Sequence, residues 1–263
     1  MGSATRAALA AGAAELAAAK GTTLETGEQL LAAARALDSS AQLRSLLADP
    51  AVEPTEKKAL IGRIFSTLSP AATELLAGLA SSRWSTASDL VDGVEEIGIR
   101  AIAGAAPSAD AIVGELFALE RAASSDAELE LALGSKLAEP AAKAALVSKL
   151  LAKSGSAGTL AIARHLVQSP RGRRIGALLG GAADIVADAA GSIVATVTVA
   201  APLAAAQQAT LETQLTQRLG RTPRLQYLID PAVIGGVRVQ VGDTVIDGTI
   251  ATRLADLRLQ LAG

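Results

Sequence analysis

The chain has 263 residues, of which 50% are hydrophobic but only 2% aromatic, and it contains 24 basic against 26 acidic residues. A formal net charge of -2 excludes the basic surface that binds nucleic acid, because such binding depends on Lys and Arg at phosphates. The absence of cysteine excludes disulfides, thiolate metal sites and cysteine nucleophiles. An apolar half composed mostly of Ala, Leu, Val and Ile predicts a mainly helical protein.

Helical periodicity extends from the N-terminus to about residue 190. The pairs Glu53-Pro54, Ser69-Pro70 and Glu139-Pro140 predict helix starts, because the missing N–H of proline costs nothing at the first helical position. Short, closely spaced helices predict a bundle. Two apolar stripes are expected on buried faces. They comprise Leu9, Ala13 and Leu16, and Leu60, Ile61, Ile64, Phe65 and Leu68.

The N-terminal segment is rich in alanine but contains Glu15 and Lys20. Alanine is weakly hydrophobic, so we expect an amphipathic helix here rather than a signal peptide. Elsewhere the sequence has no uninterrupted apolar run of about 18 residues, the length that a membrane-spanning helix needs. The sequence therefore predicts no membrane span.

Two parts of the helical region repeat each other. Pro54 pairs with Pro140, 86 positions later, and Gly93 pairs with Gly181, 88 positions later. We interpret this as a duplicated helical bundle. The second copy lacks a counterpart of the first helix, so we expect one long helix, over about residues 85–105, to serve both copies.

Around Gly191 the apolar period changes from 3.6 to 2, which predicts a strand over residues 193–199. Pro202 is expected to open a helix that ends at Gly220. Further strands are expected around Leu225, Tyr227 and Ile229, and around Val237, Val239 and Val241 with Arg238 and Gln240 facing out.

Gly242-Asp243 has the composition of a type II′ hairpin loop, which would lead into residues 244–247. A last helix is expected with Ile250, Leu254, Leu257 and Leu261 on one stripe. The fold class is thus predicted as mainly α, a duplicated helical bundle followed by a small α+β domain of βαββα type. The expected domains are residues 1–105, 106–190 and 191–263.

Enzyme motifs are missing from the sequence: it has no phosphate loop, no nucleophile elbow and no HExxH motif. His165, the only histidine, is expected to be a satisfied structural or surface imidazole. We predict no catalytic residue, no cofactor and no metal. Carboxylates recur at helical spacing and are expected on solvated faces, since acid–base catalysis needs unlike, partly buried environments. They are Asp92, Glu95, Glu96, Asp184 and Asp188.

Arg171, Arg173 and Arg174 form the densest basic cluster, just after Pro170, where we expect a helix to start. Positive charge at a helix N-terminus opposes the helix dipole. We therefore expect a carboxylate partner, either within this chain or on a neighbouring one, with phosphate binding as the alternative. Trp84, the only tryptophan, is expected to pack between helices or to be an interface anchor.

The run from Ile229 to Ile250, followed by Arg253 and Leu254, closely resembles the C-terminal signature of the ATP synthase delta subunit, called oligomycin-sensitivity conferral protein in mitochondria. Residues 46–50 and 57–70 are similar to the family's N-terminal helical bundle. The duplication is similar to the longer delta subunits of actinobacteria. Structural positions of the signature are Asp230, Gly235, Gly236, Gly242, Asp243, Asp247 and Gly248.

This resemblance implies a non-catalytic subunit of the peripheral stalk, or stator, of the proton-translocating rotary ATP synthase, at the cytoplasmic face of the bacterial cell membrane. It implies that the helical bundle binds N-terminal helices of the alpha subunits and that the C-terminal domain binds the b subunits. Contact with the beta subunits stays open. Contact with the membrane is expected only indirectly, through the b subunits.

In the family, the groove that binds the catalytic head lies between the first and fifth helices. Carried over to this chain, the partner-binding candidates are Leu9, Ala13, Leu16, Leu75, Leu76 and Leu79, with Trp84 as a further candidate. The same side chains are equally expected in an ordinary core. The alternative function is a helical adaptor that binds amphipathic helices outside the ATP synthase, which neighbouring reading frames would distinguish. An enzyme using the carboxylate pairs is the third hypothesis.

Overall fold

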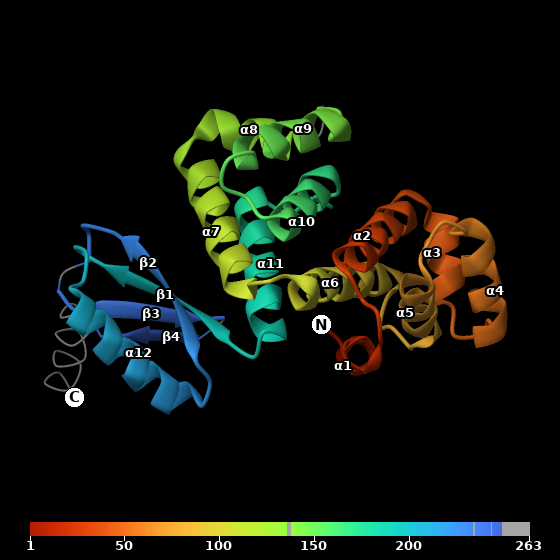
Figure 1. The fold of residues 1–263 in the computed structure, drawn as a ribbon, viewed down its shortest axis with the longest axis horizontal. Helices are drawn as coiled ribbons and strands as arrows, with labels where there is room; N and C mark the ends of the chain where they lie inside the picture. The colour runs from red at the N-terminus through yellow and green to blue at the C-terminus, as the bar shows by residue number, and fades with distance from the viewer. Residues whose placement is uncertain (136–137, 234, 243, 249–263) are drawn as a thin grey trace, which may run out of the picture. The chain divides into compact units, whose positions relative to one another are not determined.

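Twelve helices and four strands are formed by the residues that the computed structural model describes, which are 1–135, 138–233, 235–242 and 244–248 (Figure 1). The chain divides into two units, Met1–Ala189 and Ala190–Gly263. In the part of the chain that the structure describes, the first unit consists of helices and loops, and the second forms a small mixed sheet and one helix. The predicted fold class, mainly α with a small α+β C-terminal part, is confirmed. The predicted division of the helical part at residue 105 stays a prediction.

The first unit contains eleven helices. After α1 they form two series, which we call the first repeat (α2–α6) and the second repeat (α7–α11). Helix α1 is Ser3–Ala18. The first repeat comprises α2 Leu24–Ser39, α3 Ala41–Ala48, α4 Pro54–Ile64, α5 Pro70–Ser81 and α6 Ala87–Ala105. The second repeat comprises α7 Ala109–Ser125, α8 Ala127–Gly134, α9 Pro140–Leu151, α10 Ala157–Gln168 and α11 Ile175–Ala189.

Three of the helix starts predicted at proline are confirmed. Pro54, Pro70 and Pro140 are the first residues of α4, α5 and α9. Before α5, the Ser69 side chain accepts a hydrogen bond from the Ala72 N–H, which satisfies one of the free amides of the first turn.

The apolar stripe predicted over residues 60–68 is wrong as a single buried helix face. Helix α4 ends at Ile64, and Phe65 already has non-helical backbone angles. Ile61 is fully buried, whereas the Ile64 side chain is 48% exposed. Phe65 and Leu68 still pack against the first core, but from the loop that follows the helix.

The two repeats share a specific contact as well as their element order. In the first repeat, Gln29 Oε1 accepts the backbone N–H of Ser69, the N-cap of α5, at 2.8 Å. In the second, Glu115 Oε2 accepts the backbone N–H of Ser156, the N-cap of α10, also at 2.8 Å. Ser156 follows Ser69 by 87 positions and Glu115 follows Gln29 by 86. The structure therefore bears out the duplication and fixes the register of α10 against α5.

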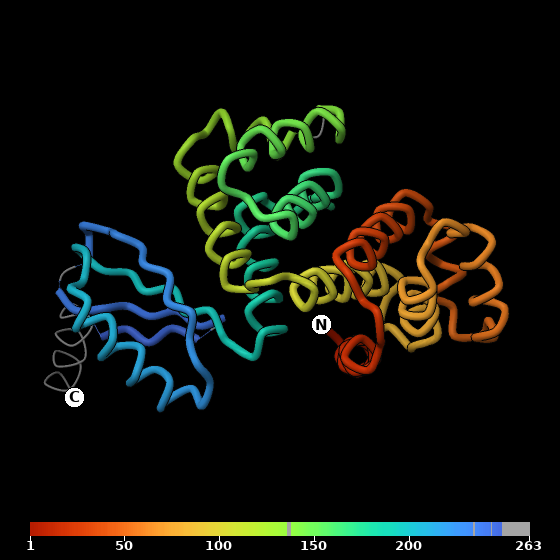
Figure 2. The backbone as a smooth tube through the Cα atoms, in the orientation of Figure 1, coloured from red at the N-terminus to blue at the C-terminus, as the bar shows by residue number. Residues whose placement is uncertain are grey.

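Helix α6 contacts both repeats. It continues without interruption through Gly98 and packs against α2 in the first repeat and against α10 and α11 in the second. The smooth path of α6 between the two groups of helices is visible in Figure 2. The prediction that one helix serves both copies is confirmed.

Helices α2 and α6 cross with backbones in close contact. A methyl group added at Gly27 would lie 2.7 Å from the carbonyl oxygen of Gly98 and 3.0 Å from the amide nitrogen of Ile102. Glycine removes the side chain that would hold the two helices apart, so the crossing depends on this residue.

The second unit contains a four-stranded sheet of order β2-β1-β3-β4. Strands β1 and β2 are parallel and are joined by α12, while β3 is antiparallel to both β1 and β4. Apolar side chains of one face of the sheet pack with leucines of α12. The elements are β1 Ile193–Val199, α12 Ala205–Leu219, β2 Pro223–Ile229, β3 Val237–Val241 and β4 Thr244–Asp247.

Some details of the C-terminal prediction change. Helix α12 begins at Ala205 rather than at Pro202, and Leu203 packs against the sheet from the preceding loop. The helix ends at Gly220, as predicted, with φ +67°. The strand expected around Leu225, Tyr227 and Ile229 is β2, and Ile229 lies at its exposed end.

The predicted hairpin joins β3 to β4, with Val241 paired to Thr244. Gly242 has φ +54°, as the first residue of such a loop requires. Asp243, which decides the turn type, lies outside the described residues, as does the helix expected over residues 250–261. Arg238 and Gln240 are exposed, as predicted.

Candidate functional site

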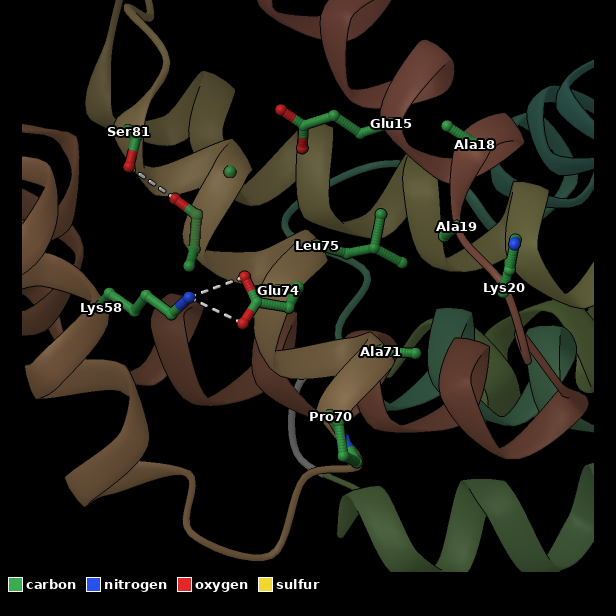
Figure 3. A pocket seen from close by; sticks show the side chains of 12 residues that line it. Glu15, Ala18, Ala19, Lys20, Lys58, Pro70, Ala71, Glu74, Leu75 and Ser81 are labelled. Carbon is green, nitrogen blue, oxygen red and sulfur yellow. Dashed lines mark hydrogen bonds and ion pairs between the residues drawn. The ribbon is translucent and has the colours of Figure 1, made fainter.

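A groove of about 660 Å³ lies between α1 and α5 (Figure 3). Its floor is formed by alanines, Leu75 and the bare backbone of Gly78. Four of the lining residues are charged: two are acidic and two are lysines. The lining residues are Glu15, Ala18, Ala19, Lys20, Lys58, Pro70, Ala71, Glu74, Leu75, Ala77, Gly78 and Ser81.

Of the six groove positions carried over from the family, only Leu75 lines this groove. Leu75 is itself only 3% exposed and belongs to the first core together with Leu76 and Leu79, and the three positions on α1 pack partly buried against that core. The two helices predicted to form the groove do enclose one, but most of the predicted side chains face the core instead of the groove. The predicted side chains on α1 are Leu9, Ala13 and Leu16.

Trp84 is a core residue in this structure. Its side chain is 7% exposed, its indole Nε1–H donates to the carbonyl oxygen of Leu79 at 2.7 Å, and its ring lies against Gly93. The expectation that the ring packs between helices is confirmed. The alternative role of Trp84 as an interface anchor would need an exposed ring, and this ring is buried.

The wall of the groove on α1 is held by close packing and by hydrogen bonds. Gly12 lies against Leu79, at a distance that leaves no room for a methyl group. At the start of α1, the buried Thr5 hydroxyl contacts Ser85 Oγ at 3.0 Å and Asp89 Oδ2 at 2.5 Å. The position of α1, and hence the width of the groove, is therefore fixed along the helix.

Charges are arranged asymmetrically along the groove. Lys58 and Glu74 form an ion pair at 2.7 Å, drawn in Figure 3. The carboxylate of Glu15 extends from α1 across to Gly78 of α5. Among the residues that the structure describes, neither Glu15 nor Lys20 forms an ion pair. An apolar floor with free charges beside it is typical of a surface that binds an amphipathic helix.

A second group of functional residues lies inside the first unit, where α2, α6 and α10 meet. We call it the Glu95 cluster; it consists of Arg35, Asp92, Glu95, His165, Arg171 and Arg173. Glu95 is 5% exposed and accepts from His165 Nε2 at 2.8 Å. Its oxygens also lie 2.7 Å from Arg171 and 2.9 Å from Arg173. Arg171 further pairs with Asp92 at 2.7 Å.

The hydrogen bonds of His165 define its protonation state. Arg35 lies 2.9 Å from Nδ1, and a guanidinium group can only donate, so Nδ1 accepts. Nε2 therefore holds the proton and donates it to Glu95. The imidazole is neutral, 1% exposed and satisfied on both sides, which confirms the structural role expected for it.

Two predictions about this cluster need correction. Glu95 is not on a solvated face, because its i, i+3 spacing from Asp92 places both next to the arginines that follow α10. Helix α11 begins at Ile175 rather than near Pro170, so the basic residues lie in the connecting loop. Of the partners considered for Arg171 and Arg173, the structure shows carboxylates of the same chain.

Other predicted carboxylates also join the repeats. Arg100 of α6 binds Glu96 at 2.8 Å and Asp188 of α11 at 2.9 Å. Ser169, after α10, donates to Asp38 of α2 at 2.9 Å. Ion pairs and hydrogen bonds thus connect the two repeats at several points.

The pKa values in the cluster follow from burial and charge. Burial alone would raise the pKa of Glu95, but the hydrogen bond from His165 and the charges of Arg171 and Arg173 lower it to about 2. Burial lowers the pKa of His165, and the neighbouring arginines add to this effect against the opposing influence of Glu95.

Both shifts predict loss of stability on acidification. An unfolded chain binds a proton at histidine below about pH 6.5 and at glutamate below about pH 4.5, whereas the folded chain resists both. The midpoint of urea unfolding, followed by the fluorescence of Trp84, should therefore fall as the pH decreases from 7.5 to 5. His165→Gln should be less stable but should lose this pH-dependent fall. An unchanged slope in the variant would contradict the assignment.

The C-terminal signature residues shape the turn before β3. Asp230 Oδ1 accepts the Ala232 N–H at 2.9 Å, and Gly235 and Gly236 have φ values of +63° and +86°. Asp247 pairs with Arg238 across the β3–β4 ladder, and the Gly248 N–H donates to Val237 at 2.9 Å. Each described signature residue thus has a backbone or turn role.

Within the described ranges, no helix is both long and apolar enough to cross a bilayer. In the same part of the chain, no three histidine or acidic side chains are grouped so that they could hold a metal ion. The described residues present an open groove lined by α1 and α5 and two helical repeats connected by ion pairs and hydrogen bonds. These features define a helical scaffold protein with a groove on its surface.

Comparison with known proteins agrees with this class. The family model described as "ATP synthase delta (OSCP) subunit" matches residues 8–96 and 99–261. The ATP synthase subunit delta of Leifsonia xyli is 48% identical over 100% of both chains. That of Streptomyces avermitilis is 40% identical over 91% of this chain and 89% of its own.

The chain therefore belongs to the ATP synthase delta (OSCP) subunit family and is a structural subunit of that complex, not itself catalytic. The resemblance found in the sequence is confirmed. A chain in the cryo-EM structure of the Toxoplasma gondii mitochondrial ATP synthase hexamer is 21% identical, with a TM-score of 0.43, covering 64% of this chain and 95% of that chain. That likeness is too weak to support any argument.

Proposed function

We propose that this chain is a peripheral-stalk subunit that holds the catalytic head of a proton-translocating ATP synthase against the torque of the rotor. Residues 1–105 bind the N-terminal helix of an alpha subunit, and residues 191–263 bind the b subunits. Residues 106–190 form the second bundle. The chain works at the cytoplasmic face of the cell membrane, which it reaches only through the b subunits. The observation that supports this best is the open groove between α1 and α5.

The groove has the chemistry that a helix partner needs. A helix with side chains is about 10 Å across, and a floor of small residues lets it approach closely. Burial of its apolar stripe on the exposed Ala18 and Pro70 and on the half-buried Ala71 would supply the binding free energy. The charges of Glu15 and Lys20, which form no ion pair with any residue that the structure describes, would set its direction.

Resisting torque requires stiffness, which the first unit has in two forms. Helix α6 is continuous and packs on helices of both repeats. Ion pairs of Glu95 join α6 to the loop after α10, and the hydrogen bond between Arg35 and His165 joins α2 to α10. None of these functions needs a nucleophile, a base or a metal. Family membership along nearly the whole chain favours the synthase subunit over an adaptor used elsewhere.

The groove predicts a specific binding defect. The three atoms nearest to a methyl group added at Gly78 all belong to the flexible end of the Glu15 side chain, so we expect Gly78→Leu to fold and to project into the groove. We expect it to weaken binding of the full chain to the purified catalytic head of the same organism by at least tenfold. Binding to the soluble part of the b subunits should be unchanged. Surface-immobilised head and b fragments measure both.

Gly181→Leu is the matched control. Gly181 also lies in a helix, is exposed and has open space around its Cα. This variant should bind the head as the unaltered chain does. Equal head binding by both variants would contradict a role for the groove, and loss of binding by both would indicate a general effect of leucine on the fold.

A further inference from the structure

The second repeat has a surface groove of its own, between α8 and α9. Its volume is about 440 Å³. Helix α8 packs on α7 and α11, whereas α9 packs on α10, so different neighbours hold the two sides of the groove. Most of the lining is apolar. The apolar lining residues are Leu131, Ala132, Ala138, Ala142 and Leu146.

Leu131 is the side chain of this groove that the core does not use. It is 73% exposed, and among the residues that the structure describes only Met1 has a more exposed large hydrophobic side chain. Leu133, two residues further along α8, is fully buried and holds the helix in place. A single exposed leucine needs no explanation, but one that borders an apolar groove indicates a binding surface.

The corresponding surface of the first repeat is more polar. Helices α8 and α9 begin 86 positions after α3 and α4. At that spacing, three exposed polar residues of the first repeat correspond to smaller or apolar residues in the groove. The pairs are Ser45 and Leu131, Asp49 and Ser135, and Glu56 and Ala142. One pair differs in the other direction, because Leu46, 44% exposed, corresponds to Ala132. The apolar groove is therefore a property of the second repeat and not of the shared architecture.

The basic residues near the groove leave little positive charge in it. Lys143 lines the groove, but its side chain is 5% exposed and its Nζ donates to the carbonyl oxygen of Ser135 at 3.2 Å. Lys149 lies beyond Leu146, the last residue of the lining. Lys136 lies outside the described residues. Lys143 thus contributes its aliphatic stem to the lining while its charge is already bound.

The acidic residues are exposed and have no ion-pair partners among the residues that the structure describes. Glu128 lines the groove. Helix α8 and its N-cap carry Asp126, Glu128 and Glu130 and no basic residue, and Glu139 precedes the first turn of α9. The field beside the apolar lining is therefore negative, which favours a positively charged partner.

We propose that the groove between α8 and α9 binds a basic amphipathic helix of another subunit of the ATP synthase. The apolar stripe of that helix covers Leu131 and approaches the alanines of the lining closely, while Lys or Arg on its flank faces Glu128. This surface is separate from the groove between α1 and α5. The second repeat thus gives the chain an attachment point of its own in the complex.

Thiol labelling tests whether the groove is covered in the assembled synthase. This inference rests on the proposed function in that it requires the chain to be assembled there. The chain has no cysteine, so Ala132→Cys and Glu130→Cys each introduce one thiol on α8, the first inside the groove and the second outside its lining. Both thiols should react equally fast with a water-soluble maleimide in the free chain. In the membrane-bound synthase, the thiol at position 132 should react about tenfold more slowly because access to its sulfur is blocked, and the thiol at 130 should not.

Photocrosslinking then identifies the occupant. A benzophenone attached at position 132 in the assembled synthase should form an adduct with another subunit, in a segment that has apolar residues at helical spacing and more basic than acidic side chains. Adding Leu131→Ser, the residue of the first repeat, should reduce this adduct about tenfold, the effect of losing one apolar anchor. The variant should fold, because Leu131 is exposed. Val245→Ser is the matched control, since Val245 is a 44% exposed residue of β4, and it should leave the adduct unchanged.

The outcomes separate this inference from the proposed function. Equal slowing at positions 130 and 132, or no slowing at 132, would overturn the inference alone. So would an adduct with a second copy, with residues 249–263 of this chain or with an acidic segment, and so would an undiminished adduct in the Leu131→Ser variant. Failure of the unaltered chain to assemble with the alpha and b subunits would contradict the proposed function and this inference with it.

Discussion

Replacing Glu95 by alanine should lower the free energy of unfolding by about 3–5 kcal/mol, the range expected when one member of a buried ion pair is removed. Glu95 is buried and meets His165, Arg171 and Arg173 within 3 Å. Without it, Arg171 would keep only Asp92, and the Nε2–H of His165 would lose its acceptor inside the protein. Urea unfolding at pH 7.5, followed by circular dichroism, measures the change.

Glu74→Ala is the control for Glu95→Ala. Glu74 also pairs with a cation, Lys58, but both side chains are more than half exposed. Exposed pairs contribute about 0–1 kcal/mol, so this variant should change stability by less than 1 kcal/mol. Similar losses in the two variants would show that burial of the Glu95 cluster has no energetic consequence.

Replacing Gly27 by alanine should destabilise the fold by about 2–3 kcal/mol, in the range of overpacked cores. Alanine is a better helix former than glycine by about 1 kcal/mol, so local propensity alone predicts the opposite sign. The methyl group would, however, meet the backbone of Gly98 and Ile102, which cannot rotate away as a side chain can. Helices α2 and α6 would have to separate, and the first core would lose contacts.

Gly114→Ala separates packing from propensity. Gly114 lies within α7, and no atom outside its own helix lies within 4 Å of an added methyl group. This variant should be unchanged or more stable by about 0.5–1 kcal/mol. Stabilisation by Gly27→Ala would contradict the close crossing of α2 and α6.

The local rules of helix starts and strand alternation predicted most of the fold. Proline at the first helical position located α4, α5 and α9, and the change of period at Gly191 located β1. The repeat predicted the shared helix α6, because the second copy has no first helix of its own. The same proline rule failed at Pro202, where the helix begins only at Ala205, and near Pro170, where α11 begins at Ile175.

The site was predicted less completely, and for a physical reason. A helical stripe shows which face of a helix is apolar, but both the core and an open groove accept apolar residues. Leu76 and Leu79 therefore could not be told apart from Leu75 by sequence pattern. Glu95 was missed because its partners lie some 70 to 80 positions further along the chain.

The central claim is that this chain anchors the catalytic head while the rotor turns. Membrane vesicles containing ATP synthase stripped of this subunit should still hydrolyse ATP but pump few protons, because a head without a stator rotates with the rotor. Adding back the unaltered chain should restore ATP-driven acidification of the vesicles, while Gly78→Leu should restore much less at equal protein concentration. Full acidification without the subunit, or equal restoration by Gly78→Leu, would contradict the claim.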